Sequence, residues 1–485
     1  MKTIFNKNLT KEEKNIPCLE IKDKRIYYKE IINSFNFVNL YKKEKSICEF
    51  LAKINTQTLR PFIRIPLKIR KSININEKDI VLIRICKEKQ ELEFVTQVYE
   101  WGLLRIPKNF VDILDIKNNE KVLIKIVGKN TALVSCNKGI DLAQIINYDK
   151  NVKIIPRQKD FIIIYYKKKI PITIPRFIES SSKLIELLFL IHGDGHYKSK
   201  LYFVNKNPEL HKFVFDGFEN IFNIPKELWR ARILLFDLDK KDYSKRYWKD
   251  TLDLKNPQFY TTSKSALKTN SRGNLRIIID KTILSLLFRF VFDKIINGLD
   301  EKNSFHALNG LLYAEGGAQL NKSGLHKITL SFNKQEKELF EKILRKASIS
   351  KLAKEEQNKT FVIGGWNNLY SFFKILLSNN IIPFRVHSER RKKAFDGFLN
   401  HSFTKTMVKH LAVLNKNNNS TANELAKLLE IRRDSILDTL RKKQYGNFVK
   451  IEGKGVNKNP FIISITKEGK IFLKLVVQLE KLKIN

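Results

Sequence analysis

Two nine-residue segments near the middle of the chain limit its possible folds more than any other feature. They are LLFLIHGDG at residues 187–195 and LNGLLYAEG at residues 308–316. Both carry leucines at helical spacing, then a small residue, an acid and a glycine, and a glycine directly after an apolar helical run favours a helix end. The segments therefore predict two similar helices that end at Asp194 and Glu315, which are 121 residues apart in the sequence.

Small residues in both segments predict that the two helices pack closely against each other. Helices can approach only where side chains are small, and three positions are of this kind: Gly193, Gly310 and Ala314. Larger side chains are expected to pack outward into flanking layers: Leu188, Ile191, Leu311 and Leu312. Two ordinary amphipathic helices that end in acid–glycine by chance are the alternative, but the second copy favours a pair.

A close helix pair would bring the carboxylates of Asp194 and Glu315 together. Two negative charges at the negative ends of two helix dipoles repel each other, so the arrangement is costly unless a divalent cation lies between them. Carboxylate oxygens suit Mg²⁺, and a metal held in this way can activate water for hydrolysis of a phosphodiester. The two motifs therefore predict a metal site with hydrolytic chemistry.

Similar strands and helices are expected after each motif. After the second, Lys327, Thr329 and Ser331 alternate with apolar residues, which indicates a half-buried strand. The residues that lead a similar strand after the first motif are Lys198, Lys200 and Tyr202. The other expected elements are helices at 209–222, 283–295, 335–347 and 367–377 and strands at 274–279 and 360–363. Each half is compatible with the order αββαββα, although not every strand is visible in the sequence.

The motifs resemble the signature of the LAGLIDADG family of homing endonucleases, and the resemblance covers roughly residues 180–401. It implies an α+β fold in which halves at 180–300 and 301–403 form a pseudo-two-fold αββαββα saddle. The polar face of the saddle would lie along the major groove of double-stranded DNA, where rows of side chains can reach base edges. The resemblance also implies a monomer in which Asp194 and Glu315 are catalytic ligands of Mg²⁺, with Mn²⁺ as a substitute.

Basic residues near the expected core are weaker candidates for catalysis. The family often places such a residue near the scissile phosphates, and the run after the last core helix contains Arg385 and His387. Lys302, just before the second motif, is the pseudo-symmetric candidate. One of these residues would stabilise developing charge, but the run at 385–393 fits a solvated helix face equally well. His192 flanks Asp194, and packing on the helix flank is favoured over a role as a metal ligand.

DNA contacts are predicted on the polar strand faces and in a long basic insertion at 238–272. The strand candidates are Lys198, Lys200, Tyr202, Lys327, Thr329 and Ser331. The insertion carries Lys245, Arg246 and Lys249 among aromatic residues, which suits phosphate and sugar contacts, and a loose basic loop is the alternative. Arg390 and Arg391 complete the candidates of the core.

The charge of the whole chain indicates a polyanionic partner. Lysine and arginine number 91 against 50 acids, so the net charge is +41 and the isoelectric point is near 9.9. Neutralised phosphates that release their counterions would supply most of the affinity for a nucleic acid. An AT-rich genome or a heat-tolerant surface would also raise the lysine content, but a heat-tolerant surface would enrich acids as well.

Two further patterns concern the surroundings of the protein. No segment approaches about 18 uninterrupted apolar residues, and the N-terminus lacks a signal-peptide core, so a cytoplasmic protein without a membrane partner is expected. Four cysteines lack CxxC spacing, which predicts free thiols and no zinc site: Cys18, Cys48, Cys86 and Cys136.

An internal repeat of 41 residues precedes the motifs. The tripeptide RIP at 64–66 recurs at 105–107, and the apolar run at 81–85 recurs at 122–126. Each copy indicates a strand, a short helix started by proline, a polar turn and a strand. The pattern resembles the swapped-hairpin DNA-binding fold of the AbrB family, here in tandem at 56–135, with Arg64 and Arg105 among its outward basic residues. A small β-barrel for protein contact or scaffolding is the alternative.

The last segment, 404–485, shows the order helix, turn, helix and hairpin. A capping-box pattern of Thr421 and Glu424 opens a helix at 422–429, and Arg432 and Arg433 begin a second helix at 432–443. A hairpin at 449–465 and a closing helix at 467–479 follow. The order resembles the winged helix-turn-helix, whose second helix enters the major groove, although any small α/β module could show it.

Together these features favour a site-specific double-strand DNA endonuclease of the homing type, with accessory DNA-binding modules at both ends. Residues 1–55 are left unassigned as an N-terminal extension, and 136–179 are expected to be connecting strands. Two alternatives stay open. One is a DNA-binding regulator that keeps the saddle without cleavage, and the other is an RNA maturase that assists intron splicing.

Overall fold

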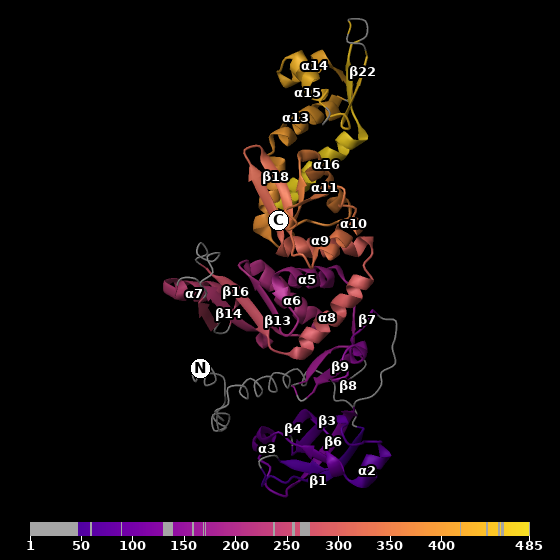
Figure 1. The fold of residues 1–485 in the computed structure, drawn as a ribbon, viewed down its shortest axis with the longest axis vertical. Helices are drawn as coiled ribbons and strands as arrows, with labels where there is room; N and C mark the ends of the chain where they lie inside the picture. Colours follow the sequence, from indigo (N-terminus) through magenta and orange to yellow (C-terminus); the bar gives the residue numbers. More distant parts are fainter. Residues whose placement is uncertain are drawn as a thin grey trace.

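The computed structural model describes residues 47–484 except for segments at 59–60, 89, 130–138, 158–159, 168, 170, 236–237, 255–257, 262–271, 418, 443–444, 454–455 and 457–459. Most of the N-terminal extension therefore lies outside the described residues, as do Cys18 and Cys136. The described part is an α+β structure of several small, mainly antiparallel sheets with helices packed on them. Its groups of elements follow one another along an elongated molecule (Figure 1).

Two helices lie side by side at the centre of the molecule, α5 (Ser182–Asp194) and α9 (Glu301–Ala314) (Figure 1). Each begins at a side-chain cap, which satisfies a backbone amide that has no partner inside the helix. The Ser181 hydroxyl accepts from the Leu184 amide, and the Asp300 carboxylate accepts from the Asn303 amide. The two helices predicted from the motifs are confirmed: α5 ends at Asp194, and Glu315 directly follows α9 as its C-cap.

Two stretches of the chain repeat the same order of elements, and each begins with one of the central helices. The first contains α5, β12 (Gly195–His196), β13 (Leu201–Asn205), α6 (Pro208–Phe222), β14 (Arg230–Leu235), β16 (Asn274–Ile279) and α8 (Thr282–Asn297). The second contains α9, β17 (Gly316–Asn321), β18 (Gly324–Ser331), α10 (Lys337–Lys346), β19 (Ala353–Glu356), β20 (Thr360–Gly364) and α11 (Trp366–Ser378). The sheet orders also match, β12-β13-β16-β14 and β17-β18-β20-β19.

The amphipathic strand β18 shows why one face of each sheet is covered. Ile328 and Leu330 are buried, whereas Lys327 and Thr329 are half-buried and Ser331 is exposed. This alternation follows from the two-residue period of a strand, which sends successive side chains to opposite faces. The strand predicted around residue 329 is confirmed, and its polar residues share one face.

The insertion of the first stretch is ordered where the structure describes it. It contains η5 (Leu238–Lys240), α7 (Lys241–Leu252) and β15 (Gln258–Thr261), which pairs in parallel with β14. Three buried residues of α7 recur at every fourth position: Ser244, Trp248 and Leu252. Because this spacing puts them on one helix face, the helix docks by that face, and the alternative of a loose loop does not hold for α7.

The 41-residue repeat folds into paired copies of the same unit. The elements are β1 (Cys48–Lys53), β2 (Phe62–Arg64), α2 (Leu67–Ser72), β3 (Ile80–Lys87), β4 (Gln90–Gln97), η2 (Glu100–Gly102), β5 (Leu103–Arg105), α3 (Lys108–Ile113) and β6 (Lys121–Lys129). Ile83 lies opposite Ile126, and Ile85 lies opposite Ile124. Ile124 is the repeat equivalent of Ile83, and Ile126 is the equivalent of Ile85. The two pairs therefore exchange under a two-fold rotation, so a local two-fold axis relates the copies.

A small sheet connects the repeat unit to the central helices. It contains β8 (Val152–Arg157), β9 (Phe161–Tyr166) and β10 (Ile172–Pro175), and short elements flank it: β7 (Ile140–Asp141), η3 (Leu142–Gln144), α4 (Ile145–Tyr148) and β11 (Phe177–Ile178). Ile155 and Ile163 pack against Leu82 in a cluster between this sheet and the repeat unit. The repeat unit otherwise has its own apolar core.

The C-terminal segment follows the helix–turn–helix–hairpin order. α12 (Ser388–Leu399) precedes it, and its own elements are α13 (Ser402–Asn417), β21 (Asn419–Thr421), α14 (Ala422–Leu429), α15 (Arg433–Leu440), β22 (Val449–Glu452), β23 (Ile462–Ile465) and α16 (Lys467–Ile484). The predicted capping box of Thr421 and Glu424 is present. Most of the turn between the two hairpin strands lies outside the described residues. This segment shares one continuous apolar core with the central helices, so it is joined to them by packing as well as by the chain.

Candidate functional site

The acids of α5 and α9 are neighbours because the two helices touch at their last turns. A Cβ placed on Gly193 would lie 2.5 Å from the Ala314 Cβ and 3.2 Å from the Glu315 Cγ. A Cβ placed on Gly310 would lie 2.9 Å from the Phe189 Cβ. Both contacts join positions 121 residues apart, so the helices run in the same direction and deliver their acids to the same place.

Asp194 is held as a carboxyl group that resists ionisation. Burial raises its pKa from 3.8 to about 6, because the charged form loses its hydration. Two neighbours act in the opposite direction: the Asn205 Nδ2, which donates to Asp194 Oδ2 at 2.6 Å, and the Arg390 guanidinium. The carboxyl group is thus oriented by one amide and only partly compensated by one cation.

Glu315 is perturbed in the same direction, and the other acid contributes to the effect. Its pKa is raised from 4.5 to about 7, chiefly by burial and then by the charges of Asp194 and Glu336, while the charge of Arg390 acts in the opposite direction. Neighbouring like charges disfavour ionisation, and the contact of the helices at Gly193 brings the two carboxyl groups close enough for this effect. Near neutral pH the single positive charge of Arg390 therefore does not fully compensate the two carboxyl groups.

Arg390, the fourth member of the site, comes from α12. Its Nη1 donates to the backbone carbonyls of Tyr313 at 2.7 Å and Ala314 at 3.0 Å, which are among the last carbonyls of α9. Burial lowers the pKa of this guanidinium, and the charges of Asp194 and Glu315 raise it. The sequence predicts Arg390 as a DNA contact, but it does not reveal that the residue reaches the two acids.

The site offers a small set of oxygen ligands. Among the described residues, no group of three or more histidine, cysteine, aspartate or glutamate side chains is arranged to hold a metal ion. Mg²⁺ needs fewer protein ligands than this, since it commonly keeps several waters and binds through one or two carboxylates. Asp194 and Glu315 supply two adjacent carboxylates of this kind, and their raised pKa values indicate that a further positive charge would be stabilising.

A buried polar cluster crosses the α5–α9 interface beneath the acids. Glu186 is 2 % exposed and accepts from the Tyr313 hydroxyl at 2.7 Å and from the Arg385 Nη2 at 2.7 Å. His306 Nδ1 lies 3.1 Å from the same carboxylate. These partners hold the pKa of Glu186 below its usual value although burial opposes ionisation. The cluster is therefore a satisfied buried ion pair, and neither motif pattern predicts it.

Arg385 and His387 do not take the catalytic positions predicted for them. Arg385 forms an ion pair with Glu186 at the helix interface, so its charge compensates that buried carboxylate. His387 is 2 % exposed and caps α12 by accepting from the Arg390 amide. Burial lowers its pKa to about 3, so the ring stays neutral. Both residues position the loop before α12, which carries Arg390.

Lys302 is also far from the acids, which corrects its predicted catalytic role. It lies exposed in the first turn of α9, whereas Glu315 follows the last turn. With a rise of 1.5 Å per residue, thirteen residues of helix separate them by about 20 Å. Lys302 lies just before the motif in the sequence, but it is at the opposite end of α9 from the site.

His192 packs on the helix flank, as predicted. Its ring stacks on Phe292 at 4.8 Å between centroids, and its Nδ1 lies 2.7 Å from the Tyr197 hydroxyl. Burial lowers its pKa to about 4, so it is neutral at physiological pH. Its Nε2 lies 3.8 Å from a Glu336 oxygen, which brings that acid to the edge of the site.

The strand candidates for DNA contact lie on or beside the two sheets. Lys198 and Lys200 are exposed before β13, and Lys200 is 3.3 Å from Asp280. Tyr202 stacks on His196 at 5.0 Å. Lys327 donates to Glu356 at 3.0 Å on the polar face of β18. These positions are compatible with a polar row on each sheet, although two of the lysines are partly neutralised.

The other candidates are distributed over the molecule. Lys245 is half-buried on α7, and the exposed ones are Arg246, Lys249, Arg64, Arg105, Arg432 and Arg433. Arg391 donates through Nη1 to the Arg385 carbonyl at 3.1 Å, which fixes it near the loop before α12. The sequence candidates therefore form several separate groups, and only the two acids and Arg390 converge.

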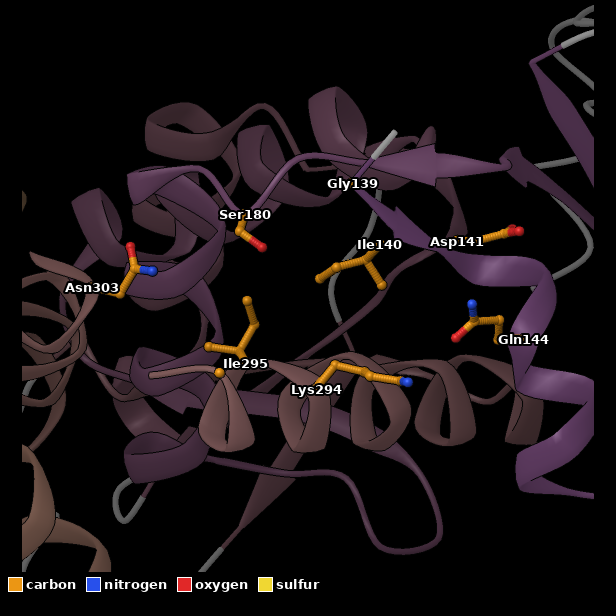
Figure 2. A pocket seen from close by; sticks show the side chains of 9 residues that line it. Gly139, Ile140, Asp141, Gln144, Ser180, Lys294, Ile295 and Asn303 are labelled. Carbon is orange, nitrogen blue, oxygen red and sulfur yellow. The ribbon is translucent and has the colours of Figure 1, made fainter. Parts of the chain in front are cut away.

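A cavity lies at the other end of the helix pair (Figure 2). It has a volume of about 230 Å³ and is lined by residues that include Ser180, Lys294 and Asn303. The amides at the start of α5 and α9 are already capped by Ser181 and Asp300, so the nearby helix ends do not need a ligand. The cavity does not contribute to the acid site.

Comparisons with known proteins do not assign the chain to a family. No family model matches the sequence, and no curated protein matches it. One solved structure to which the chain is similar is the solution structure of PHS018 from Pyrococcus horikoshii, at 26% identity and a TM-score of 0.17. The match covers 19% of this chain and 99% of that protein. Within the described residues, the structure contains no helix of the length and apolar character that crossing a membrane requires.

Proposed function

We propose that this protein is a metal-dependent, site-specific DNA endonuclease of the LAGLIDADG type. The observation that carries the proposal is the contact of α5 and α9 at Gly193, which makes Asp194 and Glu315 neighbours. Two carboxyl groups with raised pKa values, held at the ends of parallel helices, form a site in which a divalent cation would offset their repulsion.

The roles of the residues follow from their contacts. Asp194 and Glu315 would hold Mg²⁺, or Mn²⁺ in its place, and the metal supplies activation of water and stabilisation of the leaving oxygen. Asn205 orients the Asp194 carboxylate through its 2.6 Å hydrogen bond. Arg390 holds the last carbonyls of α9 and brings a positive charge to the position where a phosphate would approach.

Features outside the site support double-stranded DNA as the substrate. The two stretches of the core share one sheet order, so a pseudo-two-fold saddle would present two similar but not identical surfaces to an asymmetric target. The polar face of β18 would lie toward the bases. The net charge of +41 suits a polyanion, and the repeat unit and the C-terminal segment would act as accessory DNA-binding modules of a monomer.

The test is cleavage of a plasmid that carries the genomic sequence flanking the gene, with Mg²⁺ or Mn²⁺ added. We expect linear product from the wild-type protein and none from Asp194→Asn or Glu315→Gln. The matched control is Glu338→Gln, an exposed acid on α10, which should cut like the wild type. Cleavage that survives both site substitutions would refute the proposal.

Arg390 favours one alternative, a DNA-binding regulator without cleavage. Its guanidinium already lies at the two acids and lowers the pKa of each, so it competes with a metal ion for the same charge. Tight binding to duplex DNA without a cut at any Mg²⁺ or Mn²⁺ concentration would support the regulator. A preference for structured RNA over duplex DNA in the same binding assay would support an RNA maturase instead.

A further inference from the structure

The repeat unit carries an exposed tryptophan in a constrained turn. Trp101 is 72 % exposed, whereas Trp229, Trp248 and Trp366 are at most 7 % exposed. Its backbone has φ 60° and ψ 13°, within the 3-10 turn η2 between β4 and β5. A bulky residue with positive φ costs energy, and such strain commonly persists where function requires it.

The turn holds this conformation through its neighbours on both sides. The Gly102 amide donates to the Tyr99 carbonyl at 3.1 Å, and the Ile65 amide donates to the Gly102 carbonyl at 2.9 Å. Gly102 has φ 75°, a conformation that favours glycine, and the Arg70 side chain packs against it. The indole is therefore presented outward by a turn that is anchored to β2.

Three arginines lie beside this turn, which itself carries the exposed acid Glu100. Arg70 packs against Gly102, Arg64 lies opposite Leu103 in the β2–β5 pair, and Arg105 is the last residue of β5. Among the described residues, no ion pair involves Arg64, Lys68, Arg70, Lys71, Arg105 or Lys108. Elsewhere in the unit cations are paired, for example Arg84 with Glu93 and Lys87 with Glu120. Arg105 also stacks over the Tyr99 ring at 4.3 Å. A group of arginines that form no ion pair, beside an exposed aromatic ring, suits a nucleic acid.

The local symmetry favours a duplex over a single strand. Ile63 lies opposite Leu104 in the β2–β5 pair, and these two residues are equivalents in the repeat. Arg64 and Arg105 are also equivalents, so the same two-fold axis relates them. A double helix carries phosphates that are related by two-fold axes, whereas a single strand does not.

We propose that Trp101 is a wedge that inserts against the base steps of double-stranded DNA while Arg64, Arg70 and Arg105 contact the flanking phosphates. Apolar side chains that enter between base steps partly unstack them, and the arginines would hold the unit at that point of the duplex. The proposal shares with the proposed function only the choice of DNA as partner, and it holds whether or not the protein cuts.

The test uses tryptophan fluorescence of the full chain in EDTA, because Trp101 is the exposed one of its four tryptophans. A 40-base-pair duplex should protect the fluorescence from quenching by acrylamide, and Trp101→Phe should remove the quenchable fraction. A duplex that contains 2-aminopurine should brighten on binding, since the wedge unstacks the probe. Continued access of acrylamide, or an unchanged probe, would overturn the proposal.

Affinity measurements separate a wedge from a structural role. Trp101→Ala and Trp101→Gly should both bind the duplex at least about fivefold more weakly, the smallest effect expected for loss of one base contact. Trp101→Gly should not lower the Tm, because glycine relieves the positive φ. The matched control is Lys121→Gln, an exposed cation on β6, with a loss of less than about twofold.

Three outcomes would point elsewhere. Protection by single-stranded DNA or RNA but not by the duplex would replace the wedge by a single-strand contact. Protection that grows with protein concentration without DNA would make Trp101 a contact between copies of this chain. Cleavage without protection would refute only the wedge, whereas protection without cleavage would leave the wedge standing and count against the nuclease.

Discussion

Replacing Asp194 by asparagine should stabilise the protein in the absence of metal at alkaline pH. The pKa of Asp194 rises from 3.8 to about 6 on folding, because burial opposes its ionisation. The folded state therefore binds a proton more tightly than the unfolded state. Its stability falls as pH rises from about 4 to about 6 and remains lower above that window. Asparagine avoids this loss and retains an oxygen that can accept from Asn205.

The size of the effect follows from the shift. At about 1.4 kcal/mol for each pKa unit, the change from 3.8 to about 6 corresponds to at most about 3 kcal/mol at pH 8. A folding unit of 150–250 residues gains about 2–4 °C in Tm for each kcal/mol. We therefore expect the core transition of Asp194→Asn to rise by several degrees.

The assay is differential scanning calorimetry of both proteins in EDTA at pH 8 and pH 4, with Glu338→Gln as the exposed control. The gain should be present at pH 8 and absent at pH 4, where the wild-type carboxyl group is protonated. Added Mg²⁺ should stabilise the wild type more than the variant, since a ligand stabilises only a state that binds it. A variant that is less stable at pH 8, or equally shifted at both pH values, would refute the view that burial strains this acid.

Other substitutions test the packing and charge of the same site. Gly193→Ala should lower the free energy of unfolding by about 1–3 kcal/mol, and with it the Tm, since its Cβ would lie 2.5 Å from that of Ala314. Gly193→Ala combined with Ala314→Gly should recover most of the loss. No recovery would mean that the helices are not in contact there. Glu186→Leu should lower the free energy of unfolding, measured with denaturant, by about 3 kcal/mol, and Glu186→Gln should lower it clearly less, because only leucine leaves several buried partners unpaired. Equal losses would contradict this account of the cluster. Arg390→Gln should raise the pKa of both acids, because Arg390 lowers both pKa values in the wild type. Stabilisation by Mg²⁺, measured as a rise in Tm, should therefore begin at a higher pH in the variant. An unchanged pH profile would place the guanidinium outside the site.

Local patterns predicted most helices and the longer strands of the core. The expected strand at 274–279 is β16 (Asn274–Ile279), and the expected helices of both stretches agree with α6, α8, α10 and α11 to within two residues at each end. The strands β12, β14, β17 and β19 were not identified. Strands of two to six residues with glycine or polar content carry little alternation, and neighbouring strands rather than local preference stabilise them.

The insertion shows a signal that a composition-based interpretation overlooks. Its lysines and aromatic residues indicated phosphate and sugar contacts, with a loose basic loop as the alternative, and the helical spacing of Ser244, Trp248 and Leu252 was not used. The Trp248 Nε1 donates to the Arg272 carbonyl at 2.8 Å, which ties the helix to the end of the insertion. Periodicity was thus the better guide than charge for this segment.

The sequence by itself determined the two central helices, their terminal acids and the small residues that let them touch. It also determined the 41-residue repeat and the capping box of the C-terminal segment, because these depend on spacing within a few turns of chain. Only the tertiary structure decided what surrounds the acids. Arg390 and Asn205 reach them from separate elements, and Glu186 draws Arg385 away from the site. Such contacts join residues far apart in the chain, and their pairing depends on how helices and sheets pack, which no local pattern encodes.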